Sequence, residues 1–413
     1  MFRLACLGLG FLLAAPAVAQ QERPLEASWN PKEAGLVLDV GVALTMDKRQ
    51  VVHNARILIQ AGKIASIGRQ SDLELPQGWR HESYPEAFAY PGMVDLHTHS
   101  HTGGWNDIND SFHPNNPELY AADALVPWNR DYQLASASGM TTVNAISGSG
   151  SNMSGPGVLV KLKPSDDFHQ VVVRNPGSVK VAQGYNPERG GADLGGTRMG
   201  MWWMLRWYLA RAKETWQEDT LDERPHLASI VGIYQEKHPF LVHTAGARDT
   251  FGTVRMFQLE AEIPVVVSHA SFHGYMAAEA IAEAGAHLNV GPRNIDFSFN
   301  QKACFQGLVE GYERAGNGSI SVQTDCPVVP LEEFPFQATI AERFGCSTWT
   351  ALESINVDPA RQILAEDQFG RLIPGLDADI VVKAGQPLDP RSPVLLVLVD
   401  GEVAYDIRDG QHY

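Results

Sequence analysis

The stretch YPGMVDLHTH, residues 90–99, runs from an apolar segment into two histidines one residue apart. In a β-strand, residues i and i+2 lie on the same face about 6.5–7 Å apart, so His97 and His99 can reach one ion. Two histidines alone would also fit a polar loop, as unrelated residues, but the Pro-Gly-x-x-Asp sequence before them favours a site. The stretch therefore predicts a strand that ends at a metal site.

Downstream of this stretch, short apolar runs alternate with helical segments such as 198–217 and 277–284. Strand–helix alternation indicates a parallel sheet, and its economical closed form is an eight-stranded α/β barrel. With 91–99 as the first strand, seven further strand candidates complete that count. They are residues 139–147, 157–163, 178–184, 238–246, 263–271, 286–291 and 318–325.

Three of these later runs end in a side chain that can bind a metal. His243 closes FLVH, His269 closes VVVSH, and Asp325 closes SVQTD. The carboxyl ends of parallel barrel strands meet on one face, where active sites lie. Zn²⁺ binds imidazole and carboxylate, leaves a position for water, and lowers the pKa of that water toward neutrality. Asp325 has the chemistry to accept the water's proton and to protonate a leaving nitrogen.

Both ends of the chain have the texture of β-structure. The segment ARILIQAGKIASIG, residues 55–68, alternates in polarity around a turn at Ala61-Gly62, and Asp400-Gly401 is a strong hairpin signal. The two ends are therefore predicted to pair into one small sheet domain.

The first residues resemble an export signal. Arg3 precedes an apolar run, and Ala17-Val18-Ala19 offers a cleavage site after Ala19. The apolar run is shorter than the roughly 20 residues that span a bilayer. We therefore expect no membrane span and a periplasmic or secreted protein. The formal net charge of −16 argues against nucleic acid and anionic membranes as partners.

Three cysteines would remain after cleavage: Cys304, Cys326 and Cys346. An odd number allows at most one disulfide and excludes a disulfide scaffold. Cys326 stands beside Asp325 without a Cys–His nucleophile signature, so we expect a buried structural cysteine.

Taken together, the motifs make the chain resemble the amidohydrolase superfamily, and above all its imidazolonepropionase-like secreted members. The matching segments are residues 90–99, 139–143, 241–246, 265–271, 322–330 and 370–382. The resemblance implies a (β/α)8 TIM barrel over residues 89–366. It also implies a small β-sandwich domain formed from residues 24–88 and 367–413, with residues 1–19 as the signal peptide.

The resemblance also implies a site and an activity. The ligands would be His97, His99, His243, His269 and Asp325, holding one or two divalent ions, with zinc the first candidate. The expected enzyme hydrolyses a carbon–nitrogen bond other than a peptide bond, an amide or cyclic amide, in a small-molecule substrate. Many two-metal members bridge their ions with a carboxylated lysine, and Lys180 is preferred for that role over Lys161. Without either lysine the site would hold one ion.

Four residues near the predicted site are candidates for substrate binding: His101, Arg198, Arg293 and Asn294. An arginine on this face could hold a substrate carboxylate through two hydrogen bonds. Two other functions stay open: an aminohydrolase (deaminase) of a heterocycle, and an exported binding protein without turnover. The second of these predicts a missing metal ligand, and none is missing. Substrate identity, cysteine pairing and assembly into a homo-oligomer are left open.

Overall fold

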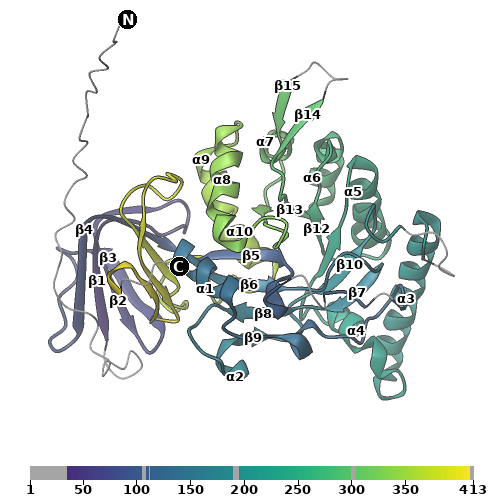
Figure 1. Ribbon diagram of the computed structural model, residues 1–413, viewed down its shortest axis with the longest axis horizontal. Coiled ribbons are helices and arrows are strands. Elements are labelled where there is room, and N and C mark those ends of the chain that lie inside the picture. The colour runs from purple at the N-terminus through teal and green to yellow at the C-terminus, as the bar shows by residue number, and fades with distance from the viewer. Residues whose placement is uncertain (1–34, 105–107, 111, 189–194, 299–303, 410–413) are drawn as a thin grey trace, which may run out of the picture.

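The computed structural model describes residues 35–104, 108–110, 112–188, 195–298 and 304–409 (Figure 1). The predicted signal peptide, its cleavage site at Ala19 and residues 24–34 of the predicted sandwich lie outside these ranges. The chain is mixed α/β, as predicted: the two ends form one sheet, and the middle alternates strands with helices. Within the described ranges, no helix combines the length and apolar character needed to cross a bilayer.

The two ends of the chain meet in a single seven-stranded sheet, on the left of Figure 1. In spatial order its strands are β19 (Glu402–Asp406), β18 (Val394–Val399), β17 (Ile380–Lys383), β4 (Arg80–Pro91), β1 (Leu36–Leu44), β2 (Val51–Gln60) and β3 (Lys63–Arg69). β17 pairs antiparallel with β4, which places Val382 opposite Ala89. One hydrogen-bonded sheet therefore joins the two ends, whereas a sandwich of two layers stays a prediction.

Turn chemistry fixes two corners of this sheet. Ala61-Gly62 joins β2 to β3 with φ values of 51° and 78°, and Asp400-Gly401 joins β18 to β19 with 49° and 73°. Two consecutive residues with positive φ are typical of the turns that match the twist of a hairpin, and glycine adopts them without strain. The side chains of this sheet form a buried apolar cluster. The cluster includes Leu38 and Ile57 from one end of the chain and Val382 and Leu398 from the other.

Every one of the eight strand candidates contains a strand in the structure. These strands are β5 (Met93–Thr98), β6 (Met140–Ala145), β8 (Val158–Lys161), β10 (Val179–Ala182), β11 (Phe240–His243), β12 (Val265–His269), β13 (His287–Val290) and β16 (Ile320–Val322). β10, β11, β12, β13 and β16 are successive parallel neighbours, and β5 is parallel to β6. The strands fall into a six-stranded and a four-stranded sheet, and a fully closed barrel stays a prediction.

The direction of the third candidate strand differs from the expected parallel one. β8 runs antiparallel to β6, and β7 (Met153–Pro156), separated from β8 only by Gly157, runs antiparallel to β10. A parallel return needs a crossover of a dozen or more residues, usually helical. Residues 146–152 form no helix between β6 and β7, so the chain turns back as in a hairpin. β9 (Val172–Arg174) then pairs antiparallel with β8.

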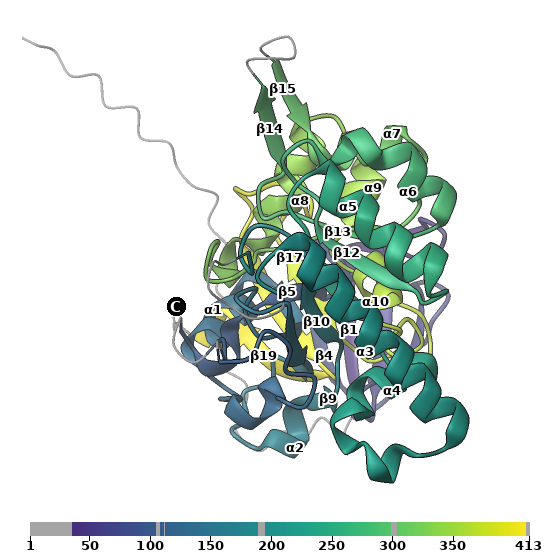
Figure 2. The same ribbon diagram turned by 90° about the vertical axis from the view of Figure 1, so that its right-hand side faces the viewer.

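Helices cover the outer side of the central strands, and α3 to α7 are seen side-on in Figure 2. The helices are α1 (Arg130–Ser138), α2 (Phe168–Val171), α3 (Arg198–Glu218), α4 (Ala228–Tyr234), α5 (Ala247–Val254), α6 (Ala278–Ala284), α7 (Leu308–Arg314), α8 (Phe334–Arg343), α9 (Thr348–Glu353) and α10 (Val357–Gln362). The main apolar core contains side chains of these helices and of the strands, for example Leu205 of α3 and Val242 of β11. A hairpin of β14 (Ile295–Ser298) and β15 (Cys304–Gly307) projects from the body.

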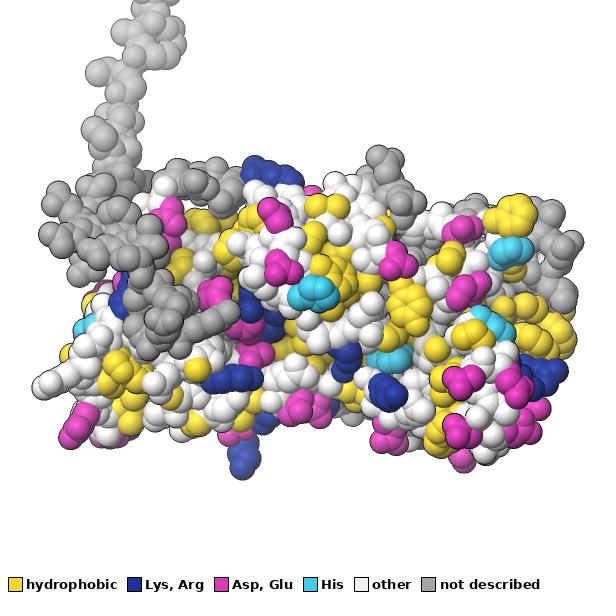
Figure 3. Space-filling view, turned by 90° about the horizontal axis from the view of Figure 1, so that it is seen from below, with side chains coloured by type: hydrophobic (Ala, Val, Ile, Leu, Met, Phe, Trp, Pro, Cys, Tyr) yellow, Lys and Arg dark blue, Asp and Glu magenta, His cyan; other side chains and the backbone are white. Residues whose placement is uncertain are grey.

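The face drawn in Figure 3 intersperses acidic and basic side chains among apolar ones. No broad basic area is visible on this face among the described residues, which agrees with the acidic composition. That the protein does not bind nucleic acid stays a prediction.

Candidate metal centre

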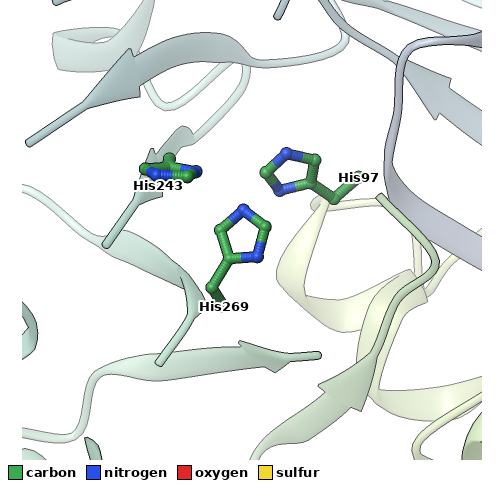
Figure 4. Close-up of side chains that lie close together, drawn as sticks. All are labelled: His97, His243 and His269. Atoms are coloured by element: carbon green, nitrogen blue, oxygen red, sulfur yellow. The ribbon is translucent and has the colours of Figure 1, made fainter. Parts of the chain in front are cut away.

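The predicted ligand residues converge at the carboxyl ends of their strands. His97 lies in β5, His99 follows it, His243 and His269 end β11 and β12, and Asp325 follows β16. Figure 4 shows the rings of His97, His243 and His269 turned toward one another. The ring centroids of His97 and His269 are 4.6 Å apart, and those of His243 and His269 are 4.3 Å apart. All four histidines are buried. The structure thus brings together five residues that span the sequence from 97 to 325.

Each of the four imidazoles makes a hydrogen bond through Nδ1 to a nearby oxygen. These pairs are His97 with Ser268 Oγ (2.5 Å), His99 with the Ile146 carbonyl (2.9 Å), His243 with Ser149 Oγ (2.9 Å) and His269 with the Gly291 carbonyl (2.8 Å). Metal-binding histidines typically use one ring nitrogen in this way, because the bond fixes the ring and its tautomer for the other nitrogen. His269 Nε2 is therefore left for a ligand, while His97 Nε2 and His99 Nε2 face Lys180 and Asp325. The His243 ring also makes a hydrogen bond to the Gly184 backbone.

Ring nitrogens of the four histidines and the Asp325 carboxylate form a donor set that fits a divalent ion. Asp325 Oδ1 lies 3.0 Å from His99 Nε2 and 3.3 Å from His97 Nε2. His269 Nε2 is buried and has no hydrogen-bond partner among the described residues, a costly state that a bound ion would relieve. Two overlapping groups, His97/His243/His269 and His97/His99/Asp325, each place their ligand atoms within 4.8 Å of one another. The donor set therefore has room for one or two ions.

Burial sets the charge state of these groups. Burial lowers the pKa of His97 and of His243 well below the ordinary value, and that of His269 to about 4. Burial alone would raise the pKa of Asp325, but the imidazoles of His269 and His99 hold it below its ordinary value. Near neutral pH His97, His243 and His269 are therefore neutral imidazoles and Asp325 is a carboxylate, the protonation states that metal binding requires.

The two lysine candidates for the bridging ligand lie in different surroundings. Lys180 lies on β10, fully buried, with Nζ 2.8 Å from His97 Nε2. Burial lowers its pKa to about 7, so a large share of the amine is neutral at neutral pH. Only the neutral amine can react with carbon dioxide, so the position and the environment of Lys180 both suit the bridging role that the sequence suggested.

Lys161 instead joins β8 to the seven-stranded sheet. Its Nζ lies 3.0 Å from Asp377 Oδ2, 3.0 Å from Asp400 Oδ1, and in contact with the carboxylate of Asp379. Burial would lower the pKa of Lys161, but these three carboxylates raise it above its ordinary value. Lys161 is therefore a charged, fully paired ammonium, which argues against its being a metal ligand.

We expect Lys161→Met to destabilise the protein by about 3–5 kcal/mol, because removing one partner leaves buried charges uncompensated. The thermal midpoint should fall by several degrees while the metal content stays unchanged. Lys213→Met, at an exposed position on α3, is the control and should change stability by no more than about 0.5 kcal/mol. A variant that loses metal at unchanged stability would restore Lys161 as a ligand.

Asp95 has a role that the sequence indicated only as part of the motif before His97. Its buried carboxylate accepts hydrogen bonds from the His97 N–H (2.9 Å), the Thr324 N–H (3.0 Å) and the Thr324 hydroxyl (2.6 Å). Burial nevertheless raises the pKa of Asp95 to about 7. These bonds tie β5 to the segment that carries Asp325. The backbone of Asp325 has a φ of 52°, an unfavourable conformation for a non-glycine residue. Asp95 thus holds in place the backbone that carries two of the predicted ligands, His97 and Asp325.

The four candidates for substrate binding lie in different surroundings. His101 is buried in the short 3₁₀ helix Ser100–Thr102. Arg198 begins α3 and pairs with Glu188 (3.0 Å) and Asp249 (3.1 Å), so its charge is already neutralised. Arg293 is exposed and donates to the Ile295 carbonyl, while Asn294 is buried and donates to Gln337 Oε1 at 2.6 Å. Asn294 thus has a structural partner, and the role of all four in substrate binding stays a prediction.

Two of the cysteines agree with the structural interpretation. Cys326 and Cys346 are buried free thiols. Burial raises the pKa of Cys346 to about 12 and that of Cys326 further above its ordinary value, so neither is an activated nucleophile. The side chain of Cys304 lies outside the described residues.

The chain resembles known proteins in structure. No family model and no curated protein sequence matches the chain. Among solved structures, an amidohydrolase from Thermotoga maritima MSB8 matches with a TM-score of 0.79 and 24% identity, covering 90% of this chain and 100% of that one. A Xaa-Pro dipeptidase with bound methionine matches at 0.59 and 15%, covering 90% and 100%.

An adenosine deaminase from Xanthomonas campestris, solved with bound zinc, matches at a TM-score of 0.51 and 16% identity, covering 92% of this chain and 94% of that one. These matches extend over almost the whole described chain and show that it shares their fold. The chain has the fold of the amidohydrolase superfamily.

Proposed function

We propose that the chain is an exported, metal-dependent amidohydrolase that cleaves a carbon–nitrogen bond, an amide or cyclic amide, in a small molecule. The observation that carries this proposal is the arrangement of the four histidines. Each Nδ1 is engaged by the protein, and the Nε2 atoms of His97 and His99 face Asp325 while that of His269 is buried without a partner. The fold, shared with solved hydrolases, supports the same conclusion.

His97, His99, His243, His269 and Asp325 would hold the ion, which supplies a Lewis acid and a water of lowered pKa. Asp325 then accepts the proton of the attacking water and later delivers it to the leaving nitrogen. Its side chain is 17% exposed, whereas those of His97 and His99 are 0% and 5% exposed. Asp325 is therefore the member of this group that an incoming substrate can reach.

Amide hydrolysis is favoured over deamination by Lys180. Its contact with His97 offers a bridging ligand for a second ion once the amine is carboxylated, and two ions suit amide hydrolysis. The similar structures include both a dipeptidase and a deaminase, so the fold by itself does not decide the bond. A binding protein without turnover is disfavoured because the ligand set is complete.

We further propose that the central strands work as one distorted (β/α)8 barrel beside a sandwich-like domain formed by the chain ends. Support for closure comes from the His99 N–H, which donates to the Cys326 carbonyl at 2.8 Å, and from the Asp325 N–H, which donates to the His97 carbonyl at 3.0 Å. These bonds connect β5 with the segment after β16. On the other side, the continuous stretch of β7 and β8 bridges β10 and β6.

We expect the purified mature protein to carry about one or two equivalents of a divalent metal, zinc foremost. Elemental analysis after expression with added zinc measures this directly. Prolonged chelation should remove both metal and turnover, and added zinc should restore them. His269→Ala should bind much less metal, whereas His169→Ala, at an exposed position on α2, is the control that should keep it. Metal far below one equivalent in the zinc-supplemented protein would contradict the proposal.

A further inference from the structure

The hydrogen bond between His97 and Ser268 can run in either direction, and the direction determines whether His97 can bind a metal. Their atoms Nδ1 and Oγ lie 2.5 Å apart, and both side chains are fully buried. A neutral imidazole carries one proton, on Nδ1 or on Nε2. If Ser268 donates to Nδ1, the proton sits on Nε2 and blocks it. If Ser268 accepts, the proton sits on Nδ1 and Nε2 offers its lone pair.

A backbone carbonyl, unlike a hydroxyl, can only accept, so the Ile146 carbonyl takes a proton from His99 Nδ1 if the two are hydrogen-bonded. His269 Nδ1 has mixed neighbours, because it lies 2.8 Å from the Gly291 carbonyl and 3.0 Å from the Gln323 amide nitrogen, which only donates. A serine hydroxyl both donates and accepts, so something else must decide for His97.

Asn289, on the neighbouring strand β13, determines the direction in which Ser268 donates its proton. Its Nδ2 lies 3.3 Å from the Val322 carbonyl and 2.8 Å from Ser321 Oγ. Since a backbone carbonyl cannot donate, the amide nitrogen of Asn289 must face Val322, and its Oδ1 must face Ser268 Oγ, 3.1 Å away. That amide oxygen only accepts, so the single proton of Ser268 is committed to Asn289.

A second backbone carbonyl fixes the same direction independently. Gln362 Nε2 lies 3.0 Å from the Leu288 carbonyl, which orients the amide of Gln362. Its Oε1 therefore faces Ser321 Oγ, 2.6 Å away, and accepts the proton of Ser321. Ser321 is then free to accept from Asn289, as the first carbonyl requires. Both anchors agree.

We propose that the buried chain Gln362–Ser321–Asn289–Ser268 sets the tautomer of His97, with Ser268 and Asn289 as positioning residues. Ser268 Oγ donates to Asn289 and accepts from the His97 Nδ1–H, so the lone pair of His97 Nε2 is available to Lys180 Nζ, 2.8 Å away, or to an ion beside Asp325. The Gln323 amide also points its nitrogen at Ser268 Oγ, 3.4 Å away, and can only donate there. The consequence for metal affinity rests on the proposed function, but the direction of the hydrogen bonds depends on the protein alone.

The test uses the full mature chain and two measurements. In metal-free protein with ¹⁵N-labelled histidine, the nitrogen shifts of His97 report which nitrogen carries the proton. In the second, competition with a chelator gives the affinity for zinc. We expect the wild-type His97 to be protonated on Nδ1, and Ser268→Ala to weaken zinc binding by about 10–100-fold. Ser268→Thr keeps the hydroxyl and should rescue the affinity to within a few-fold of wild type.

Asn289→Leu keeps Ser268 but frees its proton, so a population of His97 protonated on Nε2 should emerge. Ser354→Ala is the matched control, because Ser354 is also a fully buried serine with one hydrogen bond, to the Ala351 carbonyl at 2.7 Å. It should change neither the tautomer nor the zinc affinity.

Wild-type His97 protonated on Nε2 would overturn the inference, and this result needs no variant to fold. An unchanged tautomer in folded Asn289→Leu would also overturn it while leaving the metal function intact. Conversely, wild-type protein with the Nδ1 proton but no affinity for zinc would support the tautomer assignment and count against the proposed function. The two proposals can therefore fail separately.

Discussion

Asp325→Asn should lower kcat by about 10²-fold or more while the protein stays folded and keeps much of its metal. The asparagine amide can still offer an oxygen to an ion, but it cannot accept the proton of the attacking water. Steady-state kinetics measures the effect on an amide substrate selected from a library of N-acyl amino acids, dipeptides and cyclic imides. Metal analysis and a thermal melt of the same sample separate lost catalysis from lost structure.

Asp123→Asn is the control for this prediction, because Asp123 is an exposed carboxylate outside the metal centre. It should leave kcat unchanged. If Asp325→Asn retained near wild-type kcat, the general base would have to be sought elsewhere. If it lost its metal completely, Asp325 would act mainly as a ligand.

The sequence predicted the strands of the central region and the placement of the ligand-type residues because both depend on local patterns. A short apolar run followed by a histidine or aspartate identifies a strand end, and the topology of parallel strands then brings such ends together. His97 and His99 meet Asp325 in this way, although His99 and Asp325 lie 226 positions apart in the sequence.

The remaining features depend on contacts between distant residues. Lys161 and Lys180 each sit in a short apolar strand, and only the structure shows that Lys161 faces Asp377, Asp379 and Asp400 while Lys180 faces His97. The antiparallel direction of β8 follows from the missing helix before β7, which no single strand pattern reveals. The hydrogen bond between Asn289 and Ser268 likewise joins residues of two strands.

A chain truncated at Ala378 is expected to be insoluble, because it lacks β17, β18 and β19. β4 would lose its neighbour β17 and become an edge strand with unpaired backbone groups, which invites aggregation. The apolar cluster of the sheet would lose Ile380, Val382, Leu396 and Leu398, all of them buried. Removing one such side chain typically costs 0.5–5 kcal/mol, so losing four approaches or exceeds the ~5–15 kcal/mol that stabilises an ordinary domain.

The truncation also removes Asp379 and Asp400, and Lys161 would then keep only Asp377 of its three carboxylates. The damage should therefore spread from the sheet into β8 and the central strands. Solubility and a thermal melt of the truncated chain measure this, with a chain that ends at Asp409 as the control that keeps every strand of the sheet. A soluble, metal-loaded truncated protein that melts within a few degrees of the full-length chain would show that the two ends fold independently, despite the pairing of Val382 with Ala89.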